Sequence, residues 1–231
     1  MSIEPHGRLL KWPTQIMLFF VLACAGLQTV QADEIAIWNF NDSDLLIDHG
    51  NGSLVSNFVT ANILFAAGTT NNARLGDLAG QSLSLQGGTG NTNNLRNITF
   101  SVSTLSFTNI VVSFATQGTS TGFTSNQFQY SLDGITFTDF GSPYVPATAF
   151  GAVPVVFSLS SIAGLNNNPN AAFRIVFNGA TSSTGNNRID NIVVEGTATT
   201  TTIPEPTTAV LLFTGLTGLI GLRRKRRKTQ D

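Results

Sequence analysis

The sequence has a single cysteine, and lysine is absent from the long stretch between Asp33 and Thr202. The cysteine, Cys24, lies near the N-terminus, so the region after it can form no disulfide of its own. Between Asp33 and Thr202, four arginines stand against ten acids, which gives this region a net charge near −6. A nucleic-acid backbone requires clustered cations, and this composition therefore argues against nucleic acid as a partner.

Signals for catalysis are also scarce. Asp42, Asp44 and Asp48 lie close together in a segment rich in Asn and Gly, which is typical of a solvated turn rather than of two acids facing across a cleft. His49 is the only histidine after the first segment, and because it stands beside residues 50–52 (GNG) it is expected to be a loop residue rather than a catalytic one. The glycine-rich residues 87–90 are followed by no lysine that could help to hold a phosphate. The sequence predicts no catalytic residue and no cofactor.

Residues 1–32 are typical of a secretory signal peptide, which the secretion translocon would recognise. Arg8 and Lys11 supply the positive start, residues 16–27 supply the apolar core, and the small residue Ala32 provides a cleavage site. The mature chain would then begin at the next residue. An alternative is a lipoprotein signal in which Cys24 carries the lipid, although the preceding leucine stands one place later than is usual.

From Asp33 to Gly196 the sequence predicts one β-sandwich domain of about 165 residues, which is enough for a sizeable core. Short β-type segments alternate with clusters of Gly, Asn, Ser and Thr. Helical periodicity over eleven or more residues occurs only in the two end segments of the chain. We expect an all-β, jelly-roll-like sandwich with a signal helix before it and a transmembrane helix after it. The ten candidate strands span residues 34–40, 54–60, 82–86, 95–102, 110–116, 126–132, 135–140, 153–159, 171–177 and 188–195.

One hairpin is specified in detail. Asp133 and Gly134 are a strong signal for a two-residue type I′ turn. With that turn, apolar side chains share the inner face, and Tyr130 pairs with Phe137 as Leu132 pairs with Ile135. The polar side chains of the first strand take the outer face: Gln127, Gln129 and Ser131.

Residues 128–140 (FQYSLDGITFTDF) and 188–196 (RIDNIVVEG), together with the opening residues 37–42, resemble jelly-roll modules of exported bacterial proteins. Such modules are commonly adhesive or bind carbohydrate, so a structural or adhesive role, a carbohydrate-binding module and a carbohydrate-active enzyme all stay open. Sugar binding favours an exposed aromatic side chain. Trp38 lies in an apolar strand and is expected in the core, whereas Tyr144, between two prolines, is the better exposed candidate.

Asp190 is the one residue for which a metal is considered. It is expected to share a strand face with Ile192 and Val194, at the rim of the core, where a carboxylate needs a partner. Jelly-roll modules often hold a structural calcium between the first and last strands, which would bring Asp190 to residues 33–42. The alternative is that Asp190 accepts backbone N–H bonds or pairs with an arginine of the domain: Arg74, Arg96 or Arg174.

Residues 203–231 combine three features in a fixed order, after a Thr-rich linker at residues 197–202. Pro204, Glu205 and Pro206 form a tripeptide that proline holds extended. The uncharged apolar run at residues 207–222 is predicted to form a transmembrane helix. Six consecutive cations follow and would keep the C-terminus in the cytoplasm: Arg223, Arg224, Lys225, Arg226, Arg227 and Lys228.

This order of tripeptide, apolar helix and arginine-rich end resembles the PEP-CTERM sorting signal of bacteria that make exopolysaccharide. The resemblance implies that an exosortase in the membrane removes the tail and passes the protein to the cell surface or extracellular matrix. We therefore expect an exported, non-catalytic protein with a structural or adhesive role and with extracellular polysaccharide as a partner. The alternative for the same residues is an ordinary membrane anchor with a stiff spacer.

Overall fold

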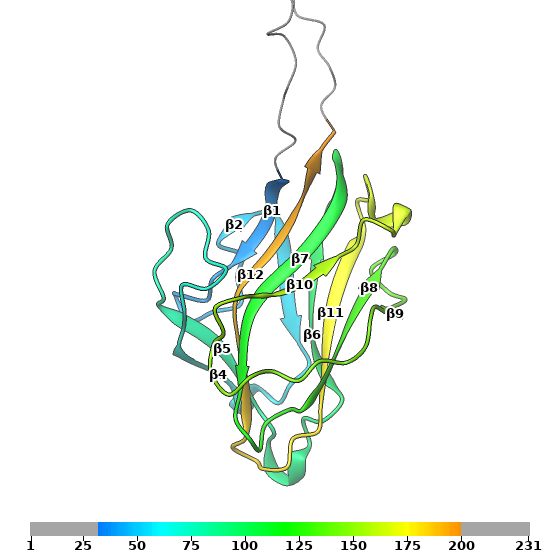
Figure 1. Ribbon diagram of the computed structural model, residues 1–231. Coiled ribbons are helices and arrows are strands. Elements are labelled where there is room, and N and C mark those ends of the chain that lie inside the picture. The colour runs from blue at the N-terminus through cyan, green and yellow to red at the C-terminus, as the bar shows by residue number, and fades with distance from the viewer. Residues whose placement is uncertain (1–31, 200–231) are drawn as a thin grey trace, which may run out of the picture. The chain divides into compact units, whose positions relative to one another are not determined.

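The computed structural model describes residues 32–199, which form a sandwich of two antiparallel β-sheets (Figure 1). The predicted signal peptide up to Gln31, the end of the Thr-rich linker, the Pro-Glu-Pro tripeptide, the predicted transmembrane helix at residues 207–222 and the basic cluster lie outside the described residues. Within residues 32–199, no helix is both long enough and apolar enough to span a bilayer.

Sheet A has seven strands: β1 (Ala32–Trp38), β2 (His49–Gly50), β4 (Ile63–Ala67), β5 (Gln81–Gln86), β7 (Phe107–Gly118), β10 (Val155–Ser158) and β12 (Asn186–Ala198). The strand β12 lies at its centre. One edge of β12 pairs with β7, and the other edge pairs first with β5 and then with β1. The strands β10, β2 and β4 extend the sheet beyond β7, β1 and β5.

Sheet B has five strands in the order β3 (Gly52–Ser56), β6 (Arg96–Val102), β11 (Ala171–Asn178), β8 (Ser125–Ser131) and β9 (Thr138–Asp139). Three single-turn 3₁₀ helices lie in connecting segments: η1 (Thr60–Asn62), η2 (Thr89–Asn91) and η3 (Ala163–Leu165). The prediction of an all-β sandwich is confirmed, and each of the ten predicted segments overlaps a strand. The short strands β2 and β4 were not predicted.

Aromatic side chains fill the space between the sheets. Phe128 of sheet B stacks on Phe157 of sheet A, with ring centroids 4.0 Å apart, and also faces Phe173 at 6.2 Å. Such pairs add about 0.5–1.5 kcal/mol each to the gain from burial. The core therefore couples the two sheets and holds the strands of sheet B in fixed positions.

Two aromatic residues considered for sugar binding both belong to this core. Trp38 is fully buried and packs against Phe100 at 5.9 Å, as expected. Tyr144 was expected to be exposed, and that prediction is wrong, because its ring packs against Phe114 at 6.0 Å and Phe157 at 6.2 Å. A bridge between Tyr144 and Asn126 draws this segment onto the core.

The hairpin between β8 and β9 exists, but its register differs from the prediction. Tyr130 pairs with Thr138 rather than with Phe137, and a loop replaces the two-residue turn. The carboxylate of Asp133 accepts bonds from nearby backbone N–H groups and so stabilises a wider loop. As a consequence Leu132 and Ile135, which were predicted inside, are exposed.

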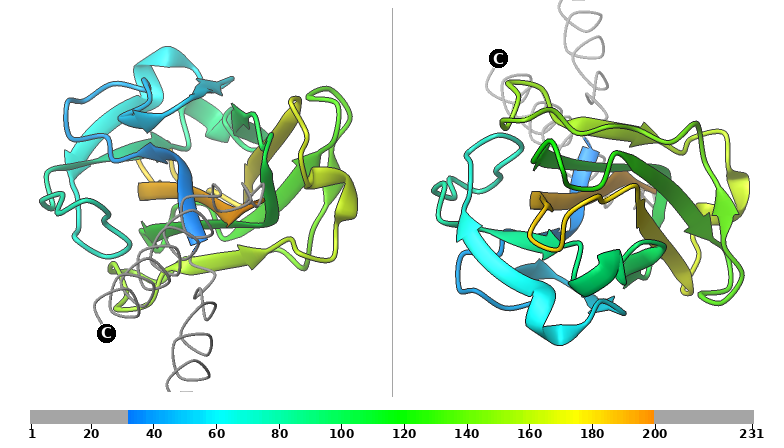
Figure 2. Two further views of the ribbon diagram at one scale, coloured as in Figure 1. Left: turned by 90° about the horizontal axis from the view of Figure 1, so that it is seen from above. Right: turned by 90° about the horizontal axis from the view of Figure 1, so that it is seen from below.

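The two ends of the described chain lie side by side. Ala32, at the start of β1, pairs with Thr197, near the end of β12. Figure 1 shows the start of β1 and the end of β12 at the top of the sandwich, and Figure 2 shows β1 (blue) and β12 (orange) from above and below. Segments attached at either end therefore leave the sandwich from the same place.

Candidate functional site

Residues 68–80, the loop between β4 and β5, cover part of the outer face of sheet A, over β7 and β12. The side-chain amide of Asn191, on β12, donates to the carbonyl oxygens of Thr69 (2.8 Å) and Asn71 (2.9 Å). The amide of Asn72 donates to the Ser113 hydroxyl on β7 (3.0 Å) and to the Asn191 carbonyl (2.8 Å). Asn191 and Ser113 are buried as a result. The loop thus satisfies the polar groups of the surface that it covers.

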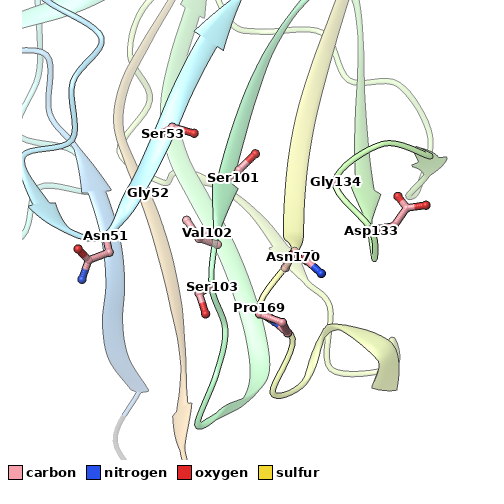
Figure 3. A pocket seen from close by; sticks show the side chains of 11 residues that line it. Asn51, Gly52, Ser53, Ser101, Val102, Ser103, Asp133, Gly134, Pro169 and Asn170 are labelled. Carbon is pink, nitrogen blue, oxygen red and sulfur yellow. The ribbon is translucent and has the colours of Figure 1, made fainter.

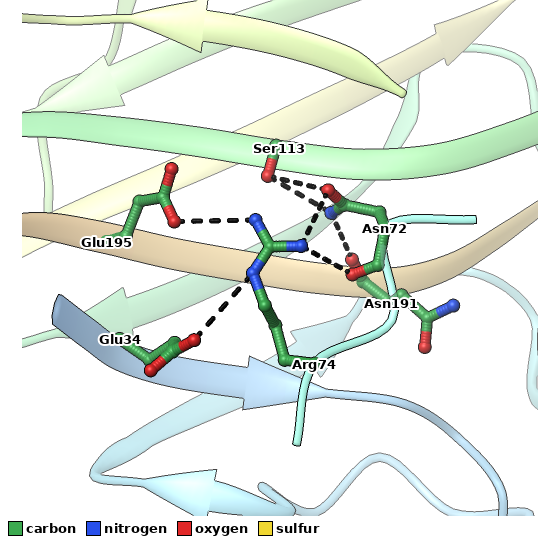
Figure 4. Close-up of polar contacts among 6 residues, drawn as sticks. All are labelled: Glu34, Asn72, Arg74, Ser113, Asn191 and Glu195. Carbon is green, nitrogen blue, oxygen red and sulfur yellow. Dashed lines mark hydrogen bonds and ion pairs between the residues drawn. The ribbon is translucent and has the colours of Figure 1, made fainter. Parts of the chain in front are cut away.

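Arg74 fastens the same loop to two strands of sheet A (Figure 4). Its guanidinium lies 3.4 Å from the carboxylate of Glu195 on β12 and 3.8 Å from that of Glu34 on β1. It also donates to the carbonyl (3.1 Å) and the side-chain oxygen (3.3 Å) of Asn72. The arginine is therefore committed to structure and is not free to bind a ligand.

Asp190 is buried beneath this loop. Its Oδ2 accepts a hydrogen bond from the backbone N of Thr69 (2.7 Å), and its Oδ1 accepts one from that of Asn191 (2.8 Å). Asp190 therefore accepts backbone N–H bonds, which was the predicted alternative to a calcium site. Burial raises the pKa of Asp190 to about 7, although these N–H groups oppose the rise. Both oxygens are thus occupied by the backbone.

The expected neighbours of Asp190 were wrong. A β-bulge in β12, where Asn191 adopts a φ of 50°, shifts the alternation by one residue. Ile192 and Val194 point into the core, whereas Asp190 lies on the outer side against the loop. Across the described range 32–199, no group of three His, Cys, Asp or Glu side chains is placed to hold a metal ion.

The acids that precede β2 build a turn, as expected. Asp48 Oδ2 accepts from the backbone N of Asn39 (2.6 Å), and Asp44 Oδ1 accepts from that of Leu46 (2.7 Å). Burial raises the pKa of Asp48 above its ordinary value. His49 is exposed in β2, at the edge of sheet A. These residues stabilise a loop and form no acid pair across a depression.

The outer face of sheet B differs, because its side chains on β3 and β6 are mostly polar and stay exposed or half-buried. The register across β3, β6, β11 and β8 places outward side chains in rows: Ser53, Ser101, Ala172 and Ser131 in one row, Val55, Thr99, Arg174 and Gln129 in the next. Ser53 and Val55 are exposed, Ser101, Thr99, Arg174 and Gln129 are half-buried, and Ala172 and Ser131 are buried. The predicted outward position of Gln129 is confirmed, whereas Ser131, predicted on the same face, is buried.

A depression of about 440 Å³ lies at one end of this face (Figure 3). It is bounded by the start of β3, the end of β6, the start of β11 and the loop after β8. Four of its polar side chains make no hydrogen bond with another described residue: Asn51, Ser53, Ser101 and Asn170. Hydroxyl and amide groups that lack a protein partner are available to a ligand.

Asp133 stands at the border of the depression, in the loop after β8. Its Oδ1 accepts from the backbone N of Ile135 (2.8 Å) and Thr136 (2.7 Å) and from the Ser131 hydroxyl (2.9 Å). These bonds hold the pKa of Asp133 well below its usual range, so the carboxylate is ionised at neutral pH. The same bonds fix the loop beside the depression.

Arg174 lies in the row next to the depression, near the middle of sheet B. Its Nε donates to Gln129 Oε1 (2.7 Å), and Gln129 Nε2 donates to Asp139 Oδ1 (2.7 Å). The guanidinium carbon lies 3.8 Å from the centre of the Phe137 ring. The two terminal nitrogens of Arg174 bond to no other residue of the described chain. Arg174 is therefore held in place with two donors uncommitted.

Sequence reasoning missed most of this site. Arg174 was considered only as a partner for Asp190, which lies on the other sheet. The alternation of Asn97, Thr99 and Ser101 with apolar residues did indicate a polar face. No feature of the sequence indicates that this face, rather than that of sheet A, stays uncovered.

Comparisons with known proteins find similarity only in structure. No protein-family model matches the sequence, and no curated protein matches it significantly. The CBM22-1 xylan-binding domain of Paenibacillus barcinonensis Xyn10C matches 74% of this chain and 99% of its own, with 9% identity and a TM-score of 0.44. Domain 4 of AbnA, an extracellular arabinanase from Geobacillus stearothermophilus, covers 74% and 95%, with 14% identity and a TM-score of 0.43. The K2 cleaved adhesin domain of Lys-gingipain covers 71% and 99%, with 13% identity and a TM-score of 0.42. At such low identities and TM-scores, these matches do not indicate what this chain binds.

Proposed function

We propose that this chain is an exported surface protein whose jelly-roll-like sandwich binds an extracellular polysaccharide on the outer face of sheet B. The observation that carries the proposal is the depression lined by uncommitted hydroxyl and amide side chains. Sugar hydroxyls donate and accept hydrogen bonds, and so do serine and asparagine side chains. The depression continues into an open strand surface, which suits a chain of sugars that extends beyond it.

The chemistry of the lining supports binding without catalysis. Glycoside hydrolysis normally uses two carboxyl groups, one of which is kept protonated by a raised pKa. Among the described residues that line the depression, Asp133 is the only acid, and its hydrogen bonds lower its pKa. An acid that stays ionised cannot protonate a leaving group near neutral pH.

The export part of the proposal rests on the sequence of residues 1–32 and 203–231. The resemblance to a PEP-CTERM tail supports delivery by an exosortase, and a signal peptide supports passage through the translocon. The depression lies toward the end of the sandwich where the chain leaves: Ser103 lines it, and Thr199 N donates to the carbonyl of nearby Ser106 at 2.7 Å.

Intact mass of the protein from its native host tests the export part. A species that begins at Asp33 and ends near Glu205 in the released fraction is expected. A full-length C-terminus that stays in the membrane fraction would reduce the tail to an ordinary anchor.

Co-sedimentation of the full-length chain, purified in detergent, with insoluble polysaccharides tests the binding part. Cellulose, xylan, chitin and matrix material from the host serve as probes, and reducing sugar is measured in the same tubes. We expect binding to at least one of them and no release of sugar. An absence of binding to all four contradicts the binding function, and release that grows with protein concentration contradicts its non-catalytic character.

A further inference from the structure

Charge is distributed unevenly over the sandwich. Eight of the ten acids between Asp33 and Thr202 belong to β1, β12 or the loops at residues 39–48 and 68–80. The strands β3, β6, β11 and β8 carry no acid, and their only charged side chains are Arg96 and Arg174. Arg174 points to the outer face of sheet B, whereas Arg96 shares the side of the buried Ile98 and Phe100. The one acid in the strands of sheet B is Asp139, on the edge strand β9.

Arg174 has the geometry of an anion receptor. Its Nε bond to Gln129 and its position over the Phe137 ring fix the plane of the guanidinium. A guanidinium in a fixed orientation loses little side-chain freedom when a ligand binds, and its terminal nitrogens can meet both oxygens of a carboxylate. By contrast, Arg74 is already paired with two carboxylates.

The position of Arg174 connects it with the depression. Arg174 and Ala172 point to the same side of β11 and are two residues apart, a separation of about 7 Å along a strand. Ala172 lies in the row of Ser53 and Ser101, which line the depression. A sugar chain bound in the hydroxyl-lined depression would therefore have the guanidinium within reach of a neighbouring unit.

We propose that the polysaccharide bound by sheet B is acidic, and that a uronic-acid carboxylate binds the terminal nitrogens of Arg174. This inference rests on the proposed function, and it adds the chemical class of the ligand. Asp139 lies near enough to act on the charge of Arg174, but it accepts its hydrogen bond from Gln129, so the terminal nitrogens of Arg174 keep their donors for the ligand. Asp133 is the acid nearest the depression, and its Oδ1 atom already accepts three hydrogen bonds from its own loop. That oxygen is therefore occupied by the protein.

Affinity electrophoresis of the full-length chain in detergent tests the inference. The gels contain polygalacturonate, alginate or hyaluronan, each beside its methyl ester, which keeps the sugar backbone and masks the carboxylate. A gel with dextran sulfate separates a preference for carboxylate from one for sulfate. We expect at least one free acid to bind about 10-fold more tightly than its ester.

Four proteins are compared in these gels. Arg174→Gln is expected to lose the preference for the free acid but to bind the ester as the wild type does, which shows that the fold is kept. Arg174→Lys keeps the positive charge but lacks the paired N–H donors of the guanidinium, so it should retain part of the preference for the free acid. Arg96→Gln makes the same change of charge on β6, at the other end of its strand from the depression, and should bind as the wild type does.

The outcomes separate the two proposals. If the free acid and its ester bind equally well, and Arg174→Gln changes neither, the proposal of an acidic ligand is overturned while the proposal of polysaccharide binding stands. If dextran sulfate binds more tightly than every carboxylated polymer, the proposal that Arg174 recognises a carboxylate is also overturned. Retention by none of the polymers, together with no co-sedimentation, overturns both.

Discussion

The outer faces of the two sheets use their polar groups differently. On sheet A, the carboxylate of Asp190, the amide of Asn191 and the hydroxyl of Ser113 are buried, and each has a partner in the loop at residues 68–80. On sheet B, the hydroxyls of Ser53 and Ser101 have no partner in the described chain and face solvent. The first arrangement stabilises the fold. The second leaves hydrogen-bonding capacity on rigid strands, where a ligand can use it.

The strongest expected effect comes from removing the cover of sheet A. A Cβ atom at Gly68 would lie 2.2 Å from the Ala79 carbonyl oxygen and 2.5 Å from Asp190 Oδ2, so Gly68→Ala must displace the loop. We expect a loss of about 3 kcal/mol in the free energy of unfolding, measured by urea denaturation.

The matched control is Gly151→Ala. Gly151 also contacts the loop, through its carbonyl and the side chain of Asn71, but the nearest atom to an added Cβ is 3.7 Å away. Its effect should stay within about 0.5 kcal/mol. Equal stability of the two variants would mean that the loop is not a structural cover.

The second effect is a dependence of stability on pH that arises on the covered face. The folded pKa of Asp190 is about 7, above the ordinary 3.8, so the folded state holds this proton more tightly than the unfolded state does. The stability that comes from the protonated carboxyl is fully present below the ordinary pKa and is lost as the pH rises through 7. Between about pH 5 and about pH 8, the free energy of unfolding should fall by roughly 2–3 kcal/mol.

Urea denaturation across this range checks the dependence. Asp190→Asn should remove most of the slope, whereas Asp42→Asn, at an exposed acid, should leave it unchanged. A wild-type stability that does not vary between these pH values would contradict the burial of an ionisable Asp190.

A smaller effect is expected from the ion pairs of the cover. Arg74→Met removes the contacts with Glu34 and Glu195, which are partly exposed, and should cost about 1 kcal/mol. The difference from the wild type should shrink in about 1 M salt, since salt screens such pairs. Arg74→Met with wild-type stability at low salt would show that the loop does not need this arginine.

The smallest effect on stability is expected on the open face. Ser53→Ala and Ser101→Ala remove hydroxyls that have no protein partner, so each should change the free energy of unfolding by less than about 0.5 kcal/mol. Thermal denaturation checks this. A clear loss of stability would show that these hydroxyls serve the fold, and the contrast between the two faces would weaken.

The sequence predicts the strands well because alternation of apolar and polar residues is local. It does not predict the features that distinguish the two faces. The bulge at Asn191 depends on one backbone conformation, and the wide loop at Asp133 depends on side-chain bonds that compete with a tight turn. The contact between Thr69 and Asp190 spans 121 residues. A pattern read along the chain cannot show which strands a distant loop will cover.

The most direct test of the central claim is to block each face in turn and to measure polysaccharide binding. Ser101→Phe fills the depression on sheet B, and Ser158→Phe adds the same bulk at an exposed serine of β10 on sheet A. Affinity electrophoresis of the full-length chain, with melting temperatures to verify folding, should show binding abolished by Ser101→Phe and unchanged by Ser158→Phe. Binding that survives Ser101→Phe in a folded protein would contradict the assignment of the open face as the binding site.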